Sequence, residues 1–174
     1  MNNDCLKILQ SGSDEQIIQA LKECRITGSD LLIRELMLLL DRTHNPLIHN
    51  EVAGILNDLN NQSSAEELMR HLPSFKTHAI FPDLVGACWQ NNLDYSAYIE
   101  FFIEVVLEGD YAASIEAFTV VENNITMLDD PTRDFLAQKI QKAKAGISPD
   151  KYGLVDELYA TVKTFSGPFR IDLS

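Results

Sequence analysis

The chain has no long hydrophobic run and no recognisable targeting segment. Its longest apolar stretch, LMLLL at 36–40, is far shorter than the roughly 18 residues that a transmembrane helix requires. The N-terminal residues MNNDCLKILQ show no basic segment followed by an apolar one, as a secretory signal would. With a mean hydropathy of -0.08, these features predict a soluble, cytoplasmic protein.

Cysteine and positive charge are also scarce. The three cysteines, Cys5, Cys24 and Cys88, are widely spaced and odd in number, which fits neither a disulfide framework nor a CxxC pair. Only 14 basic residues stand against 26 acidic ones, so the net charge is -12. A negative chain repels phosphate backbones and anionic lipids, which disfavours nucleic acid and membranes as partners.

What the sequence does contain is helical signals. Between successive turn signals, apolar residues recur at i, i+3, i+4 and i+7, and no segment alternates as a half-buried strand would. The fold class is therefore predicted to be all-α. The expected helix starts are residues suited to capping: Ser13-Asp14, Ser29-Asp30, Asn45-Pro46, Ser64 with Glu67 as a capping box, Gly109-Asp110, Asp130-Pro131 and Ser148-Pro149.

Two apolar columns repeat at intervals of about 32 residues along the chain. Five first helices share an apolar position, at Leu9, Leu40, Leu72, Ile103 and Leu136, and the residues just before these extend the same inward stripe: Ile8, Leu39, His71, Phe102 and Phe135. The second helices share Leu21, Leu56, Cys88 and Val121, each preceded by an apolar pair such as Val52-Ala53. Two interleaved columns of one period predict stacked helix pairs.

The predicted organisation is one domain over residues 1–174 that consists of five helix pairs and a short tail. Such pairs cannot bury their apolar faces alone, so each is expected to stack on its neighbours. The predicted pairs span 3–25, 29–60, 63–91, 94–123 and 131–164, and the tail spans 165–174.

The second pair resembles a HEAT repeat. Residues 31–59, LLIRELMLLLDRTHNPLIHNEVAGILNDL, combine a Leu-rich first helix, an aspartate near its end, a turn with proline and a Val-Ala pair in the second helix. Residues 84–124 are similar in style to uncharacterised HEAT-like proteins of bacteria. The match departs in one respect: HEAT repeats place Arg or Lys early in the second helix, where this chain has His49 or Asn50.

The resemblance implies an armadillo-type fold, a right-handed α-α superhelix of about five HEAT-like helix pairs. It also implies a scaffold that presents its second helices on a concave binding face. Some HEAT-like proteins act on bound tetrapyrroles or DNA bases, so the fold alone does not exclude chemistry.

Two histidines five residues apart, His44 and His49, form the only segment that resembles a metal motif. A zinc site on one helix face needs histidines at i and i+4. Here the predicted helix start at Pro46 separates them, which leaves His44 in a turn and His49 in the first helical turn. We therefore predict neither a metal site nor a cofactor, and because no nucleophile has a plausible base, we predict no enzyme.

The candidate binding residues lie on the predicted second helices, opposite the buried column. Aligning those helices places Asn57, Trp89 and Glu122 in one mostly polar row. Trp89, the only tryptophan, has two interpretations: it packs at the corner between helix pairs, or it anchors a partner on the concave face, as aromatic hot spots do. The complete predicted site is Asn57, Asp58, Trp89, Gln90, Thr119, Glu122 and Asn123.

The function predicted from these observations is a non-enzymatic scaffold or adaptor that binds a protein or peptide, with a partner of basic character suggested by the acidic composition. One alternative is a binder of a small molecule or prosthetic group, with lyase-like activity and a pocket near Trp89. A second alternative is a structural subunit of a homo-oligomer that uses the same face.

Overall fold

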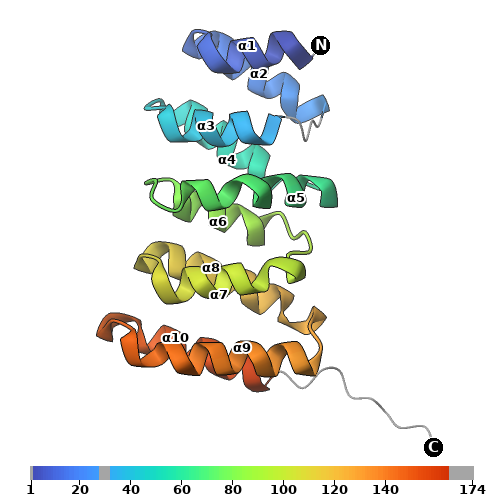
Figure 1. The fold of residues 1–174 in the computed structure, drawn as a ribbon. Coiled ribbons are helices and arrows are strands. Elements are labelled where there is room, and N and C mark those ends of the chain that lie inside the picture. The colour runs from blue at the N-terminus through green and yellow to red at the C-terminus, as the bar shows by residue number, and fades with distance from the viewer. Residues whose placement is uncertain (1, 28–31, 165–174) are drawn as a thin grey trace, which may run out of the picture. The chain divides into compact units, whose positions relative to one another are not determined.

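The structure, a computed structural model, describes residues 2–27 and 32–164. Within these ranges the chain forms ten α-helices and no β-strand (Figure 1), which confirms the predicted all-α class. None of these helices combines the length and apolar character that crossing a membrane needs. The helices are α1 (Asn2–Ser11), α2 (Asp14–Thr27), α3 (Ile33–Arg42), α4 (Pro46–Asn57), α5 (Gln62–His71), α6 (Phe81–Gln90), α7 (Ile99–Glu108), α8 (Tyr111–Asn124), α9 (Asp130–Ala143) and α10 (Tyr152–Thr164).

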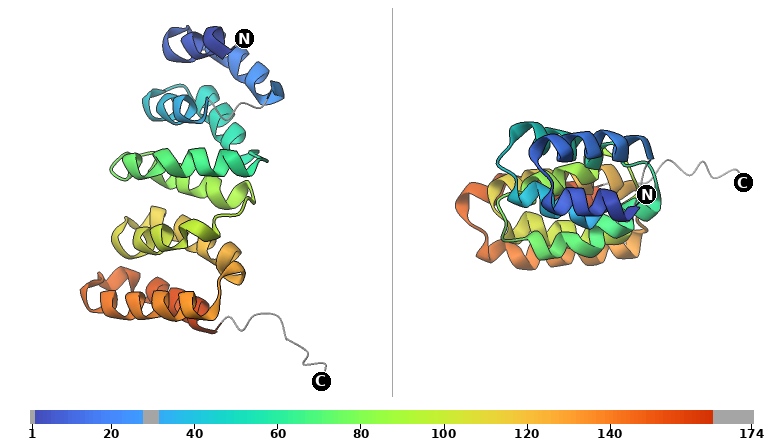
Figure 2. Two further views of the ribbon diagram at one scale, coloured as in Figure 1. Left: turned by 45° about the vertical axis from the view of Figure 1, so that its right-hand side comes forward. Right: turned by 90° about the horizontal axis from the view of Figure 1, so that it is seen from above.

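The helices form two compact units, residues 1–93 and residues 94–174. In the first unit, α1 packs on α3 and α3 on α5, while α2 packs on α4 and α4 on α6 (Figures 1 and 2). The pairs α1/α2 and α3/α4 also pack internally, and α5 and α6 both contact the short 3-10 helix Leu72–Phe75. First helices therefore contact first helices, and second helices contact second helices.

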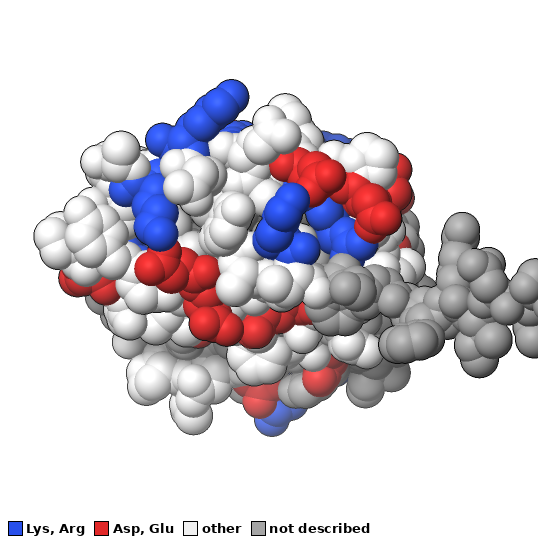
Figure 3. All heavy atoms as spheres, turned by 90° about the horizontal axis from the view of Figure 1, so that it is seen from below, with Lys and Arg blue, Asp and Glu red and all other residues white. Residues whose placement is uncertain are grey.

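The second unit has the same order of packing. Its pairs are α7/α8 and α9/α10, with α7 against α9 and α8 against α10. Figure 3 shows the side of this unit that faces downward in Figure 1, where acidic and basic side chains lie next to one another. Two ion pairs of this unit join α9 and its following turn to α10: Lys163 with Asp134, at 2.7 Å, and Lys144 with Asp156.

The apolar columns predicted from the sequence lie in the cores. All five positions of the first-helix column are buried, and so are Leu21, Leu56, Cys88 and Val121 of the second. Burial of each large aliphatic side chain stabilises the fold by roughly 1.5–3 kcal/mol relative to exposure. In three of the four apolar pairs that precede the second column, only the first residue is buried. These residues are Ile17, Val52 and Ala117, and the residue after each is partly exposed.

One member of the predicted inward stripe is misplaced. Phe135 on α9 is 57% exposed, although its equivalents Leu39 and Phe102 are buried. In α9 the buried residues are Leu136, Ala137 and Ile140, so the apolar face is rotated by one position and Phe135 lies outside it. The prediction that Phe135 faces inward is therefore wrong.

Helix starts follow the predicted caps at most described positions. The side chains of Asn45, Asp110 and Asp129 accept hydrogen bonds from backbone amides in the first turns of α4, α8 and α9. At Ser13, the backbone amide donates to Gln16 Oε1 at 2.9 Å, and Gln16 N lies 3.4 Å from Ser13 Oγ. The predicted start at Ser29-Asp30 lies outside the described residues.

The predicted capping box at Ser64 is wrong, and α7 and α10 begin later than predicted: α10 starts at Tyr152, after the 3-10 helix Pro149–Lys151, and Ser148 forms no side-chain cap. The helix α5 already starts at Gln62, so Ser64 lies within its first turn and is buried. The chain before α6 forms the 3-10 helix Leu72–Phe75 and a turn, which delays α6 to Phe81. Before α7, Asp94 Oδ1 accepts from Ser96 N at 2.8 Å, and this side-chain turn competes with helix formation.

Candidate functional site

In the first unit, the predicted site residues lie where α4 and α6 end. Asn57 is the last residue of α4 and Gln90 the last of α6. Asn57 Nδ2 donates to Gln90 Oε1 at 2.7 Å. The alignment of the repeats pairs Asn57 with Trp89 instead, so the observed bond is displaced by one residue. Asp58, which follows α4, is exposed. The structure therefore brings together Asn57 and Gln90, with Asp58 next to Asn57 in the chain.

Trp89 occupies an intermediate environment. Its neighbours in α6, Ala87 and Cys88, are buried, and Gln90 after it is exposed. The indole itself is half-buried. It is thus neither a fully buried core residue nor a freely projecting one, and it directly precedes Gln90 in α6.

In the second unit, the predicted residues Thr119, Glu122 and Asn123 lie on α8. Thr119 is half-buried and its hydroxyl donates to Ile115 O at 3.2 Å. Glu122 and Asn123 are exposed. Partial burial, and then the negative charge of Glu157 on α10, raise the pKa of the Glu122 carboxyl. The seven predicted residues therefore form two groups, one in each compact unit.

The sequence interpretation missed the exposed apolar residues of the second helices. On α8, Tyr111 is 52% exposed and Ile115 is 41% exposed. Leu47 on α4 and Tyr152 on α10 are exposed as well. A signal exists in hindsight: Tyr111, Ile115 and Phe118 are spaced by four and three residues, which adds a second apolar stripe to the one that the core uses.

The histidines form separate pairs with carboxylates. His49 Nε2 lies 3.3 Å from Asp83 Oδ2, which links α4 to α6, and His78 Nδ1 lies 2.9 Å from Asp41 Oδ2. His71 pairs with Glu67 within α5, and His44 is an exposed turn residue. Nowhere in the described residues do three potential metal ligands converge. His49 thus holds neighbouring second helices together, in the region where a HEAT repeat has a basic residue.

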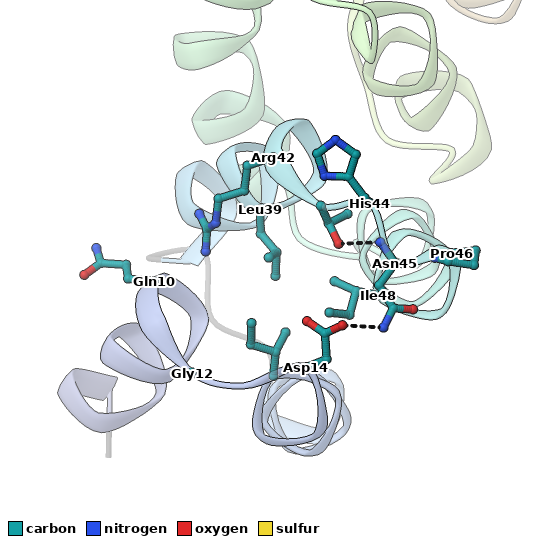
Figure 4. A pocket seen from close by; sticks show the side chains of 11 residues that line it. Gln10, Gly12, Asp14, Leu39, Arg42, His44, Asn45, Pro46 and Ile48 are labelled. Carbon is teal, nitrogen blue, oxygen red and sulfur yellow. Dashed lines mark hydrogen bonds between the residues drawn. The ribbon is translucent and has the colours of Figure 1, made fainter.

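A pocket of about 710 Å³ lies in the first unit between the α1–α2 turn and the α3–α4 turn (Figure 4). Asn45 Nδ2 donates to Asp14 Oδ2 at 2.8 Å across it, and Arg42 donates to Leu9 O at the end of α1. The predicted turn residue His44 also lies at its edge. The apolar lining consists of Ile17, Leu39 and Ile48. These polar groups already bond one helix pair to the next, so their main role is to hold the two pairs together.

A second pocket, of about 480 Å³, occupies the corresponding turns of the second unit. Buried Lys151 donates to Leu107 O at 3.1 Å and to Gly109 O at 2.9 Å, at the end of α7. Burial lowers the pKa of this amine. Lys139 Nζ lies 2.7 Å from the carboxylates of both Glu100 and Glu104, and these hydrogen bonds raise its pKa. Lys151 and Arg42 therefore play the same part, as cations that satisfy the last carbonyls of a first helix.

No protein-family model matches the chain, no curated protein matches it, and no solved structure matches it. The fold and the residues above define an all-helical protein of ten described helices, packed in pairs that are neighbours in sequence.

Proposed function

We propose that the chain is a HEAT-like αα-repeat protein, a right-handed superhelix of about five helix pairs, and that it acts as a non-enzymatic scaffold for a protein or peptide. Support for the architecture comes from the packing order within each unit, where equivalent helices contact each other in series. The buried columns at a period of about 32 residues support it further. Arrays of this kind expose one continuous layer of second helices, which suits extended partners.

The proposed binding function rests on the positions of the large exposed hydrophobic residues. Six are found among the described residues, and four of them lie on second helices: Leu47, Tyr111, Ile115 and Tyr152. The first helices carry only Phe135, on α9, and Met127 lies in a short 3-10 helix. Single exposed apolar residues are ordinary on protein surfaces. Their concentration on one class of helix is what favours the second helices as the binding surface.

The polar surroundings also suit an interface. Half-buried Trp89 directly precedes Gln90, whose side chain accepts from Asn57, and interface hot spots are commonly aromatic residues bordered by polar ones. The net charge of -12 favours a partner of basic character, because opposite charge accelerates encounter and suppresses wrong partners.

A crosslinking map tests this proposal. A photo-crosslinking amino acid is placed singly at exposed or half-exposed second-helix positions, namely Leu47, Gln90 and Ile115, and at exposed first-helix positions, namely Lys7, Glu66 and Gln138. In cells that express the protein, we expect defined adducts from the first set and none above background from the second. Adducts formed equally by both sets, or only by the first helices, would contradict a binding surface on the second helices.

The pocket at the first two turns supports a second candidate function, a binder of a small molecule. Its volume of about 710 Å³ falls in the roughly 300–1,000 Å³ range of ligand sites. This location differs from the position near Trp89 that the sequence suggested. A co-purifying small molecule, identified by mass spectrometry and lost on Leu39→Trp substitution, would favour this function over the scaffold.

A further inference from the structure

One side of α8 carries an unusual series of residues, which we call the α8 stripe: Tyr111, Ile115, Phe118 and Glu122. Their spacings of four, three and four residues place them along a single line of the helix. Tyr111, Ile115 and Glu122 are exposed and Phe118 is half-buried. The residues that α8 does bury are a separate set: Ala113, Ser114, Ala117, Val120, Val121 and Asn124. The first three residues of the α8 stripe therefore add apolar surface to α8 beyond its core face.

The helix that carries the stripe is firmly held. At its start, Asp110 Oδ1 accepts from Ala113 N at 2.8 Å, and Ser114 Oγ donates to Asp110 O at 2.7 Å and Val106 O at 3.1 Å. At its end, Asn124 Oδ1 accepts from the backbone amide of buried Tyr95 at 2.8 Å. A rigid helix presents its side chains without a large ordering cost when a partner binds.

The far end of the stripe is negatively charged. Glu122 and Glu157 on α10 are both exposed, and the charge of Glu157 adds to the effect of partial burial in raising the pKa of the Glu122 carboxyl. The α8 sequence contains no Lys or Arg. On the neighbouring pair, Lys144 and Lys163 are engaged with Asp156 and Asp134. Among the residues that the structure describes, Glu122 and Glu157 form no ion pair, so both carboxylates are accessible to a basic group of a partner.

We propose that the α8 stripe docks a basic amphipathic segment of another protein, with apolar side chains against Tyr111 and Ile115 and a Lys or Arg between Glu122 and Glu157. This inference rests on the proposed scaffold function and names the partner class for one part of that surface. An amphipathic helix suits the site because its residues at i, i+3, i+4 and i+7 match a stripe of the same spacing. A second copy of this chain fits less well, since its own stripe would bring more negative charge.

Selection from a library of random 16-residue peptides, displayed on phage against the full chain, tests the proposal. We expect selected peptides to contain several Lys or Arg residues and large apolar residues three or four positions apart. Affinity is then measured by fluorescence anisotropy with synthetic copies. The Tyr111→Ala/Ile115→Ala variant should bind about tenfold more weakly or worse, as truncation of interface anchors typically does. The Glu122→Gln/Glu157→Gln variant should bind several-fold more weakly and with less dependence on salt.

Matched controls separate the stripe from the rest of the surface. Phe135→Ala removes an equally exposed aromatic residue from α9, and Glu66→Gln removes an exposed charge from α5; both should leave affinity unchanged. Circular dichroism and thermal melting check that the stripe variants fold, which we expect because the altered side chains are exposed.

The failures of the two proposals are distinguishable. Selected peptides without basic residues, peptides that ignore all α8 changes, or a library that yields no binder would each overturn the docking proposal. If binding is instead lost in Asn57→Ala/Gln90→Ala, the scaffold function stands and the α8 site does not. Sedimentation that shows a dimer of the wild type, abolished by Ile115→Asp, would overturn the docking of a foreign segment in favour of self-association.

Discussion

Trp89 combines the only indole of the chain with a half-buried position next to the end of α6. Full truncation of a completely buried Trp costs about 3–5 kcal/mol. Because part of this indole is already in water, we expect Trp89→Ala to lower the free energy of unfolding by about 1–3 kcal/mol, measured by urea denaturation. Phe135→Ala serves as the exposed aromatic control. A loss above the expected range would identify Trp89 as a packing residue rather than an interface anchor.

Lys151 satisfies the last carbonyls of α7 from within the protein. Replacement by Met keeps the apolar stem but leaves Leu107 O and Gly109 O without this donor, so we expect a loss of about 1–3 kcal/mol in the free energy of unfolding. Lys142→Met, an exposed position on α9, is the matched control and should be nearly neutral. The two variants are compared by chemical denaturation, and equal effects would show that the hydrogen bonds of Lys151 contribute nothing.

The raised pKa of Glu122 predicts how the stability of the protein depends on pH. Its pKa in the folded protein lies above the ordinary value of 4.5, so the folded state binds this proton more tightly than the unfolded state does. The contribution of Glu122 to stability therefore falls as the pH rises from 4.5 through the raised pKa. We expect Glu122→Gln to be more stable than the wild type at neutral pH, with the difference vanishing in acid, where both states are protonated. Melting temperatures across this range measure the effect, and a pH-independent difference would argue against this cause.

At the scale of the helices, local caps decide where elements begin. Asp110 caps α8 through its bond to Ala113 N, and loss of an N-cap typically costs about 0.5–2 kcal/mol. We therefore expect Asp110→Ala to destabilise the protein by about 1 kcal/mol in thermal or urea unfolding. Asp110→Asn keeps the cap while it removes the charge and should be nearly neutral. If both variants are destabilised alike, the charge matters and the hydrogen bond does not.

The caps also show which structural features can be predicted from the local sequence. Asn45 and Asp110 were predictable because a cap needs only its own side chain and an amide two or three residues on. Ser64 has the same local pattern, but α5 begins earlier and buries that hydroxyl. For α8 the sequence shows two apolar rows, and both satisfy helical periodicity, so periodicity alone does not tell which row is buried.

At the scale of the whole molecule, the two compact units predict a localised response to core mutations. Leu56 is buried in the first unit and Leu158 in the second. Stacked helix pairs interact mainly with their neighbours, so stability is approximately a sum of local terms. Leu56→Ala should reduce amide hydrogen-exchange protection mostly within residues 1–93, and Leu158→Ala mostly within residues 94–164. A uniform loss of protection in both variants would mean that the chain opens as a single cooperative unit.

The sequence by itself determined the all-helical class, the caps at Asn45 and Asp110, and the two main columns of core residues, because these depend on periodicity and on contacts within a few residues. Only the tertiary structure decided which polar groups meet, as Asn57 does with Gln90 and His49 with Asp83. It also decided that Tyr111 and Ile115 remain in solvent while Ala117 and Val121 are buried. The physical reason is that exposure and pairing depend on which faces of a helix its neighbours cover. For α8 the covering helix is mainly α7, the helix just before it, whereas Asn57 and His49 meet residues more than 30 positions further along the chain.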